Sequence, residues 1–254
     1  MRYAVISDVH ANLEALNSVL KKITEEAVDE LFFLGDIVGY GPNPNECIEA
    51  LKEKTNILLA GNHDWASVGM TDVEYFNPYA RAAVEWTQKV LRDENIAFLR
   101  KLPLTEGLDN SIFLVHATPR EPEQWHYLTT TRDADINFRF FKERLCFIGH
   151  SHEPAIIGLS PVGIDLPTDK AGSYREEKIT FFKERAEIKE GHRYIVNAGS
   201  VGQPRDGNPY ASYALLNKNS IEIKRVSYDI VSTQKKMRDA GLPEYLINRL
   251  SWGR

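Results

Sequence analysis

The sequence predicts an α/β fold in which two sheets pack face to face. Up to His152, apolar stretches of strand length alternate with stretches of helical period, which predicts largely parallel strands joined by right-handed crossovers. Beyond His152, short strand-like pieces separated by turn residues predict antiparallel pairs in a second sheet packed on the first. A third observation concerns function: the apolar stretches of the first part all end in Asp, Asn or His.

Five apolar runs in the first part predict strands buried on both faces. They span residues 3–6, 31–34, 57–60, 112–115 and 146–148. Just after them stand seven polar residues: Asp8, His10, Asp36, Asn62, His116, His150 and His152. Because open α/β sheets place ligand sites at the carboxyl ends of their strands, we expect these side chains to gather at one rim.

The segments between these runs have helical patterns. Asn12 is placed to cap a helix whose apolar positions recur from Leu13 to Ile23. Further helices are expected near 47–51, over 78–99 as one or two helices that end before Pro103, and over 133–141.

The second part predicts short strands followed by helices. The strand-like pieces are residues 156–158, 178–182, 193–197, 212–216 and 221–226. The charged, turn-rich stretch 160–191 is expected to be an exposed excursion with a hairpin, and helices are expected over 230–240 and 244–250. No repeat or linker divides the chain, so we expect a single domain over 1–254. The last segment, 241–254, either packs back on its own sheet or forms a homo-oligomer contact.

Composition narrows the function classes. The chain has 254 residues, 43% of them hydrophobic, a formal net charge of −5 and a pI near 5.9. It therefore has no general attraction for polyanions, and we expect neither broad nucleic-acid binding nor membrane binding. The N-terminal run reaches Asp8 without a signal-peptide apolar region, no run approaches membrane-spanning length, and Cys47 and Cys146 are the only cysteines. These features predict a soluble cytoplasmic protein.

The side chains after the apolar runs have the chemistry of a transition-metal site. Hard divalent ions prefer carboxylates, whereas imidazole suits Mn, Fe, Co, Ni and Zn. Seven donors are too many for one ion, so we expect two divalent ions that share the Asp36 carboxylate. If these segments are extended, Asp8 and His10 share a face, as do His150 and His152. Taken singly, such residues are often helix caps or ordinary polar groups, but five of the seven histidines follow apolar runs.

Four short motifs contain most of these side chains, and His116 lies between the last two. They are Asp8-Val9-His10, Gly35-Asp36, Gly61-Asn62-His63-Asp64 and Gly149-His150-Ser151-His152. This ordered set resembles the calcineurin-like metallophosphoesterases, which include diadenosine tetraphosphatases and small bacterial phosphodiesterases. The resemblance implies a four-layer α/β/β/α sandwich with two mixed sheets and a dinuclear metal site at the strand ends.

The resemblance also assigns roles to the residues. One ion would be held by Asp8, His10, Asp36 and His152, and the other by Asp36, Asn62, His116 and His150. A hydroxide that bridges the two ions would attack phosphorus in line. His63 would polarise the phosphate and protonate the leaving oxygen.

Two residues outside the motifs are candidates for substrate binding. Arg205 ends the glycine-containing stretch 197–205, whose backbone N–H groups can approach an anion, and it offers a bidentate phosphate contact. A surface role explains Arg205 as well. Asn12 can donate to a phosphate oxygen, and helix capping explains it equally well.

The motifs also depart from the protein-phosphatase branch of the resembled family. In that branch a second aspartate follows the bridging one and orients the catalytic histidine, but residues 36–41 here read Asp-Ile-Val-Gly-Tyr-Gly. Asp64 is the remaining candidate to orient His63. Ala11 also stands where relatives often have glycine.

The predicted function is metal-dependent hydrolysis of a phosphate ester or phosphoanhydride. A phosphodiesterase or dinucleoside polyphosphate hydrolase, acting on a small nucleotide-like substrate, is favoured. The alternatives are a serine/threonine protein phosphatase and a non-catalytic metal-binding scaffold. The missing aspartate disfavours the first, and the complete ligand set disfavours the second.

Overall fold

Two six-stranded sheets form the centre of the structure. The structure, a computed structural model, describes residues 1–161 and 177–254. The first sheet has the order β3 (Ile57–Leu58), β2 (Glu30–Phe33), β1 (Tyr3–Ile6), β11 (Ala211–Asn217), β12 (Ser220–Val226) and β9 (Arg185–Glu187). The second has the order β4 (Thr105–Leu108), β5 (Ile112–Val115), β6 (Leu145–Ile148), β10 (Arg193–Asn197), β7 (Ala155–Pro161) and β8 (Glu177–Phe182).

Both sheets mix parallel and antiparallel pairs. In the first, β1, β2 and β3 are parallel and β11 runs antiparallel to β1. In the second, β5, β6 and β10 are parallel, and β7 runs antiparallel to β10. The carboxyl ends of β1, β2, β5 and β6, which precede most of the predicted site residues, belong to these parallel portions.

Eight α-helices are found in the described residues: α1 (Leu13–Glu25), α2 (Pro44–Lys52), α3 (Asn62–Ser67), α4 (Pro78–Val90), α5 (Asp93–Leu99), α6 (Thr131–Asn137), α7 (Ile230–Asp239) and α8 (Glu244–Arg249). Single 3₁₀ turns occur at Val73–Tyr75 and Pro122–Gln124. None of these helices combines the length and apolarity that crossing a membrane requires.

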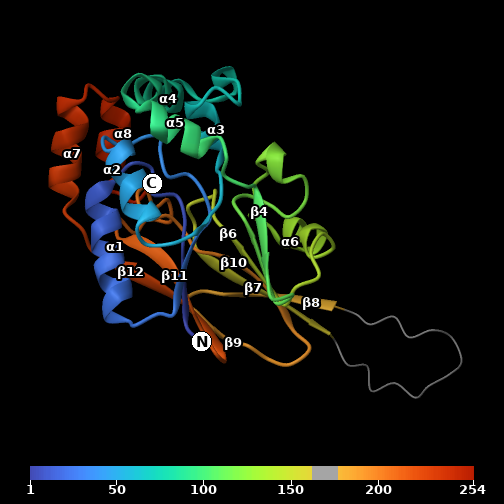
Figure 1. The fold of residues 1–254 in the computed structure, drawn as a ribbon. Helices are drawn as coiled ribbons and strands as arrows, with labels where there is room; N and C mark the ends of the chain where they lie inside the picture. The colour runs from blue at the N-terminus through green and yellow to red at the C-terminus, as the bar shows by residue number, and fades with distance from the viewer. Residues whose placement is uncertain (162–176) are drawn as a thin grey trace, which may run out of the picture.

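Alternating side chains divide the core into layers. Val5, Phe32 and Phe147 belong to a buried cluster between the two sheets. The opposite face of the first sheet packs on α1 and α2, and the opposite face of the second packs on α6, so the sheets lie between helices (Figure 1). The predicted α/β/β/α sandwich with two mixed sheets is confirmed.

Strand assignment to sheets differs from the prediction. The later strands do not form a separate sheet, because β11, β12 and β9 extend the first sheet while β7, β8 and β10 join the second. β5 and β6, expected to continue the first sheet, lie in the second instead. The helix expected over 133–141 is α6, which begins at Thr131 because Thr130 and Asp133 form a capping box.

The predicted excursion at 160–191 is described in part. Residues 162–176 lie outside the described residues. The segments on either side, β7 and β8, form an antiparallel pair as expected of a hairpin, whereas β9 pairs with β12 at the edge of the first sheet. The single-domain organisation stays a prediction.

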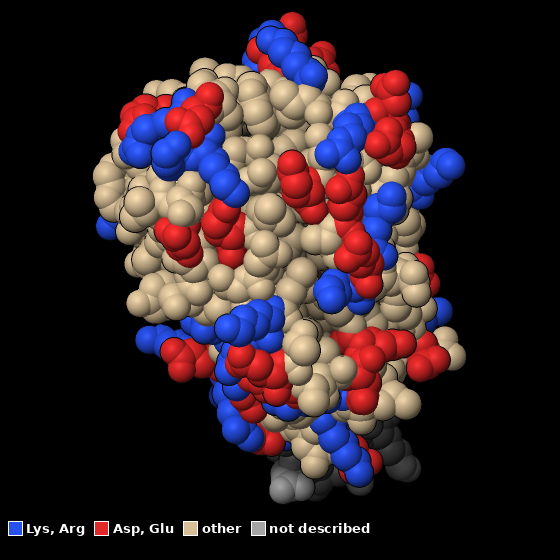
Figure 2. Space-filling view, turned by 60° about the vertical axis from the view of Figure 1, so that its left-hand side comes forward, with Lys and Arg blue, Asp and Glu red and all other residues tan. Residues whose placement is uncertain are grey.

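The C-terminal helices pack on other helices rather than on a sheet. Met237 of α7 and Leu246 of α8 share a buried cluster with Ala83 of α4 and with Tyr40. Tyr79 and Tyr245 stack with their ring centroids 4.6 Å apart. On the face shown in Figure 2, acidic and basic side chains are interspersed. A subunit contact through segment 241–254 stays a prediction.

Candidate metal centre and active site

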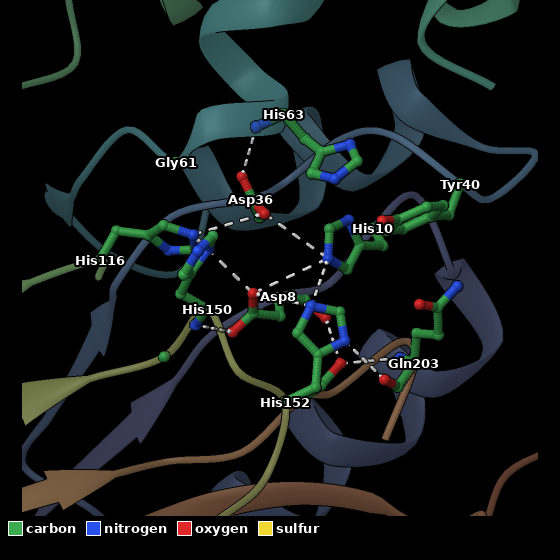
Figure 3. A network of polar contacts seen from close by, with 12 residues as sticks. Asp8, His10, Asp36, Tyr40, Gly61, His63, His116, His150, His152 and Gln203 are labelled. Carbon is green, nitrogen blue, oxygen red and sulfur yellow. Dashed lines mark hydrogen bonds and ion pairs between the residues drawn. The ribbon is translucent and has the colours of Figure 1, made fainter. Parts of the chain in front are cut away.

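Six of the predicted metal-binding side chains converge at one rim, where the two sheets meet (Figure 3). Asp8 and His10 follow β1, Asp36 follows β2, His116 follows β5, and His150 and His152 follow β6. All six are at most 7% exposed. Donor atoms within 4.8 Å of one another define three groups: Asp8, His10 and His152; His10, Asp36 and His63; Asp36, His116 and His150.

Left-handed backbone, and not extended backbone, brings these side chains together. β1 ends at Ile6 and β6 at Ile148, before the pairs expected to share a strand face. The φ angles are positive at Asp8 (54°), His10 (48°), Asp36 (60°), His150 (65°) and His152 (62°). Each such residue costs about 1–2 kcal/mol. Backbone hydrogen bonds between the loops, from Asp8 N to Gly35 O and from His10 N to Asp36 O (both 3.0 Å), help to hold this conformation.

In one set of potential metal ligands, lone pairs of ring nitrogens face each other. The Nε2 atoms of His10 and His152 lie 3.0 Å apart. Their Nδ1 atoms lie 3.1 Å from Val38 O and 2.6 Å from Gln203 O, and a carbonyl only accepts, so each Nδ1 carries the proton. In the neutral rings both Nε2 atoms are therefore acceptors, and Asp8 Oδ1 lies 3.2 Å from His152 Nε2. Only a proton or a cation can satisfy this arrangement, and the residues present fit a metal ion.

A second set of potential metal ligands lies on the other side of Asp36. The Oδ2 atom of Asp36 lies 3.4 Å from His116 Nε2 and 3.6 Å from His10 Nε2, so this carboxylate faces both sets. The Nε2 of His150 and the Oδ1 of Asn62 are buried without a hydrogen-bond partner in the described part of the chain. Unpartnered buried polar atoms are rare in folded proteins, and a second cation would satisfy these two.

The electrostatics of the rim follow from burial and from the close carboxylates. Burial lowers the pKa of His63 to about 4 and that of His150 to about 3. It acts on His116 in the same direction, but the Asp36 carboxylate outweighs it and raises the pKa to about 9. Burial opposes ionisation of Asp8 and Asp36, yet the neighbouring histidines hold the pKa of both carboxyls below its usual range. Ionised carboxylates beside mainly neutral imidazoles are suited to divalent cations.

His63 lies beside the metal-binding groups. Its backbone N–H donates to Asp36 Oδ1 (2.8 Å), and its ring packs against Tyr40 and Phe76 with centroid distances of 4.4 and 4.9 Å. Its Nδ1 has no hydrogen-bond partner within residues 1–161 and 177–254. Gly39 has a φ of +88°, and a Cβ there would lie 2.5 Å from His63 Nδ1, so the ring needs glycine at this position.

Asp64 does not orient His63, contrary to the sequence-based alternative. Its Oδ2 accepts from the backbone N–H groups of Asp36 (2.8 Å) and Gly61 (3.0 Å), and its Oδ1 accepts from that of Val38 (3.1 Å). Asp64 thus shapes the loop that presents Asp36. Burial and the nearby Asp36 carboxylate raise the pKa of Asp64 to about 7, against the effect of the backbone donors.

We expect Asp64→Ala to destabilise the fold by about 3 kcal/mol or more, because three buried N–H groups lose their acceptor. Asp133→Ala is the matched control, since the Asp133 carboxylate also accepts from backbone N–H groups at the start of a helix but is partly exposed, and about 1 kcal/mol is expected there. Urea unfolding with a chelator present, so that metal affinity plays no part, measures both losses. Equal losses would contradict the structural role given to Asp64.

The two predicted substrate-binding residues differ in their surroundings. The guanidinium of Arg205 donates to Gln203 Oε1 (2.9 Å) and to the Tyr40 hydroxyl (3.3 Å), with no carboxylate partner among the described residues. The amide of Asn12 accepts from Ala15 N (3.2 Å) and donates to Gly202 O (2.9 Å), which matches the helix-capping alternative. Both substrate-binding roles stay predictions.

A cavity of about 550 Å³ adjoins the rim. Asn62, His63 and His150 line one part of it, together with Trp125 and Tyr127, which sequence reasoning missed. The available signal was a pair of aromatic residues in a polar loop shortly after His116. The carbonyl partners of His10 and His152 were also missed, because every residue has a backbone carbonyl and the sequence does not show which one lies near a given side chain.

Comparison with known proteins identifies a family that agrees with this arrangement of metal-binding side chains. The family model for calcineurin-like phosphoesterases matches residues 1–196, which include all four motifs and His116. An uncharacterized protein of Methanocaldococcus jannaschii is 40% identical over 99% of this chain and 98% of its own length. A metallophosphoesterase from Sphaerobacter thermophilus is 42% identical with a TM-score of 0.81, covering 100% of this chain and 99% of its own.

A protein from Pyrococcus horikoshii shares the fold at 22% identity, with a TM-score of 0.74 and coverage of 100% of this chain and 98% of its own. The full-length relatives and the family match agree with the geometry of the rim. The chain belongs to the calcineurin-like phosphoesterase family and is a hydrolase of phosphate esters.

Proposed function

We propose that the chain is a phosphodiesterase or dinucleoside polyphosphate hydrolase that depends on two divalent transition-metal ions, drawn from Mn, Fe, Ni, Co and Zn. The observation that carries this proposal is the position of Asp36 Oδ2, 3.6 Å from His10 Nε2 on one side and 3.4 Å from His116 Nε2 on the other. A carboxylate placed between two sets of unsatisfied donors is suited to bridge two cations.

The donor sets support a division of the ligands. One ion would be held by Asp8, His10, Asp36 and His152, and the other by Asp36, Asn62, His116 and His150. When bound, two such ions supply Lewis acidity toward phosphoryl oxygens and lower the pKa of water so that it can attack phosphorus near neutral pH.

Side chains of this protein would then bind the phosphate and handle the proton. The protonated His63 ring would donate a hydrogen bond to a phosphate oxygen and would give its proton to the leaving oxygen, which leaves a neutral imidazole. Arg205 binds a second phosphate oxygen, because its charge has no carboxylate partner among the described residues and Tyr40 and Gln203 hold its guanidinium. Tyr40 and Phe76 pack against the His63 ring and hold it at the edge of the cavity.

The protein-phosphatase alternative is less well supported. No carboxylate among the described residues bonds to His63 Nδ1, and Asp64, the one candidate left by the sequence, binds backbone N–H groups instead. Without such a partner, His63 lacks the orienting aspartate that the resemblance assigns to protein phosphatases.

Substrate panels test the proposal. We expect protein loaded with Mn(II), Ni(II) or Co(II) to hydrolyse bis(p-nitrophenyl) phosphate, and to cleave dinucleoside polyphosphates or nucleotide diesters faster than phosphoserine and phosphothreonine peptides. A preference for the phosphopeptides would favour the phosphatase alternative. Two equivalents of bound metal without turnover on any substrate would favour the scaffold.

Metal removal is expected to lower the thermal stability. Two ions, each present at about 100 times its Kd, contribute about 5 kcal/mol in total. For a chain of this size, that corresponds to a fall in Tm of about 10 °C or more on chelation. Differential scanning calorimetry with and without a chelator measures the change, and an unchanged Tm would argue against ions bound at this buried rim.

A further inference from the structure

The cavity of about 550 Å³ beside the rim has the size of a small-molecule site. The residues that line it beyond His63 and the proposed metal ligands are mainly aromatic or neutral polar. They are Tyr40, Thr71, Phe76, Asn77, Ala80, Glu123, Gln124, Trp125 and Tyr127. A group attached to a phosphate at the rim would extend into this space.

Two aromatic rings are fixed at the boundary between the rim and the cavity. Trp125 packs edge-on against Trp65 (5.3 Å between centroids) and against His116 (5.9 Å). Tyr127 stacks on His150 at 4.4 Å with an interplanar angle of 27°. Tyr127 is nevertheless 55% exposed and Trp125 is partly exposed, so both rings retain surface that a ligand can cover.

The loop that carries these rings has an unusual backbone. Glu121 (φ 49°) and Trp125 (φ 54°) are left-handed on either side of the 3₁₀ turn Pro122–Gln124. Such strained non-glycine positions persist only where the surrounding structure holds them, and they concentrate at sites that clamp ligands. The strain therefore accords with a functional position for Trp125.

The charge of the cavity defines what it can accept. Among the described residues, Glu123 is the only charged residue that lines the cavity apart from the histidines of the rim, and no Lys or Arg lines it. Arg205, which has no carboxylate partner among the described residues, lies over the Tyr40 ring and does not line the cavity. A cavity of this kind disfavours a second phosphate or an acidic peptide. It suits a neutral planar group that carries N–H donors, with Glu123, Asn77 and Gln124 available to hydrogen-bond its edge.

We propose that this cavity binds a nucleobase of the substrate, which stacks against Trp125 and Tyr127 and donates its amino or imino hydrogens to Glu123. The inference rests on the proposed phosphodiesterase function and names the residues that would select a nucleotide. Bases combine a flat apolar face with a polar edge, and stacking on aromatic side chains is the usual way in which proteins hold an unpaired base.

Binding measurements test this without requiring turnover. Isothermal titration calorimetry of the full chain loaded with Mn(II) compares AMP, GMP, CMP and UMP with ribose 5-phosphate, which lacks only the base. We expect at least one nucleotide to bind about 10-fold more tightly than ribose 5-phosphate, or better. Trp125→Ala is expected to reduce this ratio to less than about 3-fold, whereas Trp125→Phe keeps most of it, because a phenyl ring still stacks.

Two further variants complete the design. Tyr127→Ala, at a half-exposed position, should also reduce the ratio and serves if Trp125→Ala fails to fold. Trp252→Ala is the matched control, because Trp252 is 58% exposed and does not line the cavity, and it should leave the ratio unchanged. Equal affinities of the wild type for nucleotides and ribose 5-phosphate, or a ratio that survives loss of either ring, would overturn the inference. If the wild type bound nucleotides and ribose 5-phosphate equally but still hydrolysed bis(p-nitrophenyl) phosphate, the base site alone would be overturned and the proposed function would stand.

Discussion

Asp36→Asn is expected to lower kcat/KM by about a thousandfold or more and to leave at most one metal ion bound per chain. The Asp36 carboxylate faces the donors on both sides, with His116 and His10 nitrogens 3.4 and 3.6 Å from Oδ2. Asparagine keeps the shape but loses the negative charge, so it cannot serve two cations. The loss corresponds to about 4 kcal/mol of transition-state stabilisation, within the range of metal-ion catalysis.

Elemental analysis and steady-state kinetics on the same preparation measure both effects. Asp229→Asn is the control, because Asp229 caps α7 and its carboxylate lies outside the metal-binding groups. That variant should retain two ions and full activity. Asp36→Asn protein that kept two ions and normal activity would show that Asp36 is not shared.

His63→Ala is expected to lower kcat by about 10²–10⁴-fold while two metal ions remain bound. The reason is that His63 would act on the phosphate and the leaving oxygen, a role worth this much in general acid catalysis. A leaving group of low pKa needs no proton, so the deficit should shrink on nitrophenyl esters relative to alkyl esters. That difference separates a proton donor from a residue that only shapes the site.

Gly39→Ala provides an independent test of the His63 position. The added methyl group would lie 2.5 Å from His63 Nδ1, at a backbone φ of +88° that disfavours alanine. Activity should fall in this variant with metal content retained. A ring nitrogen of His63 also forms a group with donors of His10 and Asp36, so loss of one ion in His63→Ala would place His63 among the ligands instead.

Much of the fold was predictable because its signals are local. Apolar runs and helical periods marked most elements, and β10 was predicted to the residue. The assignment of strands to sheets was not predictable, because it depends on pairing between distant segments. β11, for example, lies beside β1 although more than two hundred residues separate them.

The site divides in the same way. Residue type and position after apolar runs predicted which side chains gather, but not how. The left-handed backbone at His10 and His152 is imposed by contacts between loops. Residues other than glycine rarely adopt this conformation, so the residue type does not predict it. Asp64 was a natural candidate to orient His63, yet its oxygens bind backbone groups that only the folded loop brings near. Trp125 and Tyr127 escaped notice because their significance lies in the cavity they line.

Anomalous diffraction from crystals of the Mn(II)-loaded protein tests the central claim most directly. Two anomalous peaks about 3.5–4 Å apart are expected, one on each side of the Asp36 carboxylate, with His152 beside one and His116 beside the other. A single peak, or peaks that do not contact Asp36, would contradict a site built on a shared carboxylate.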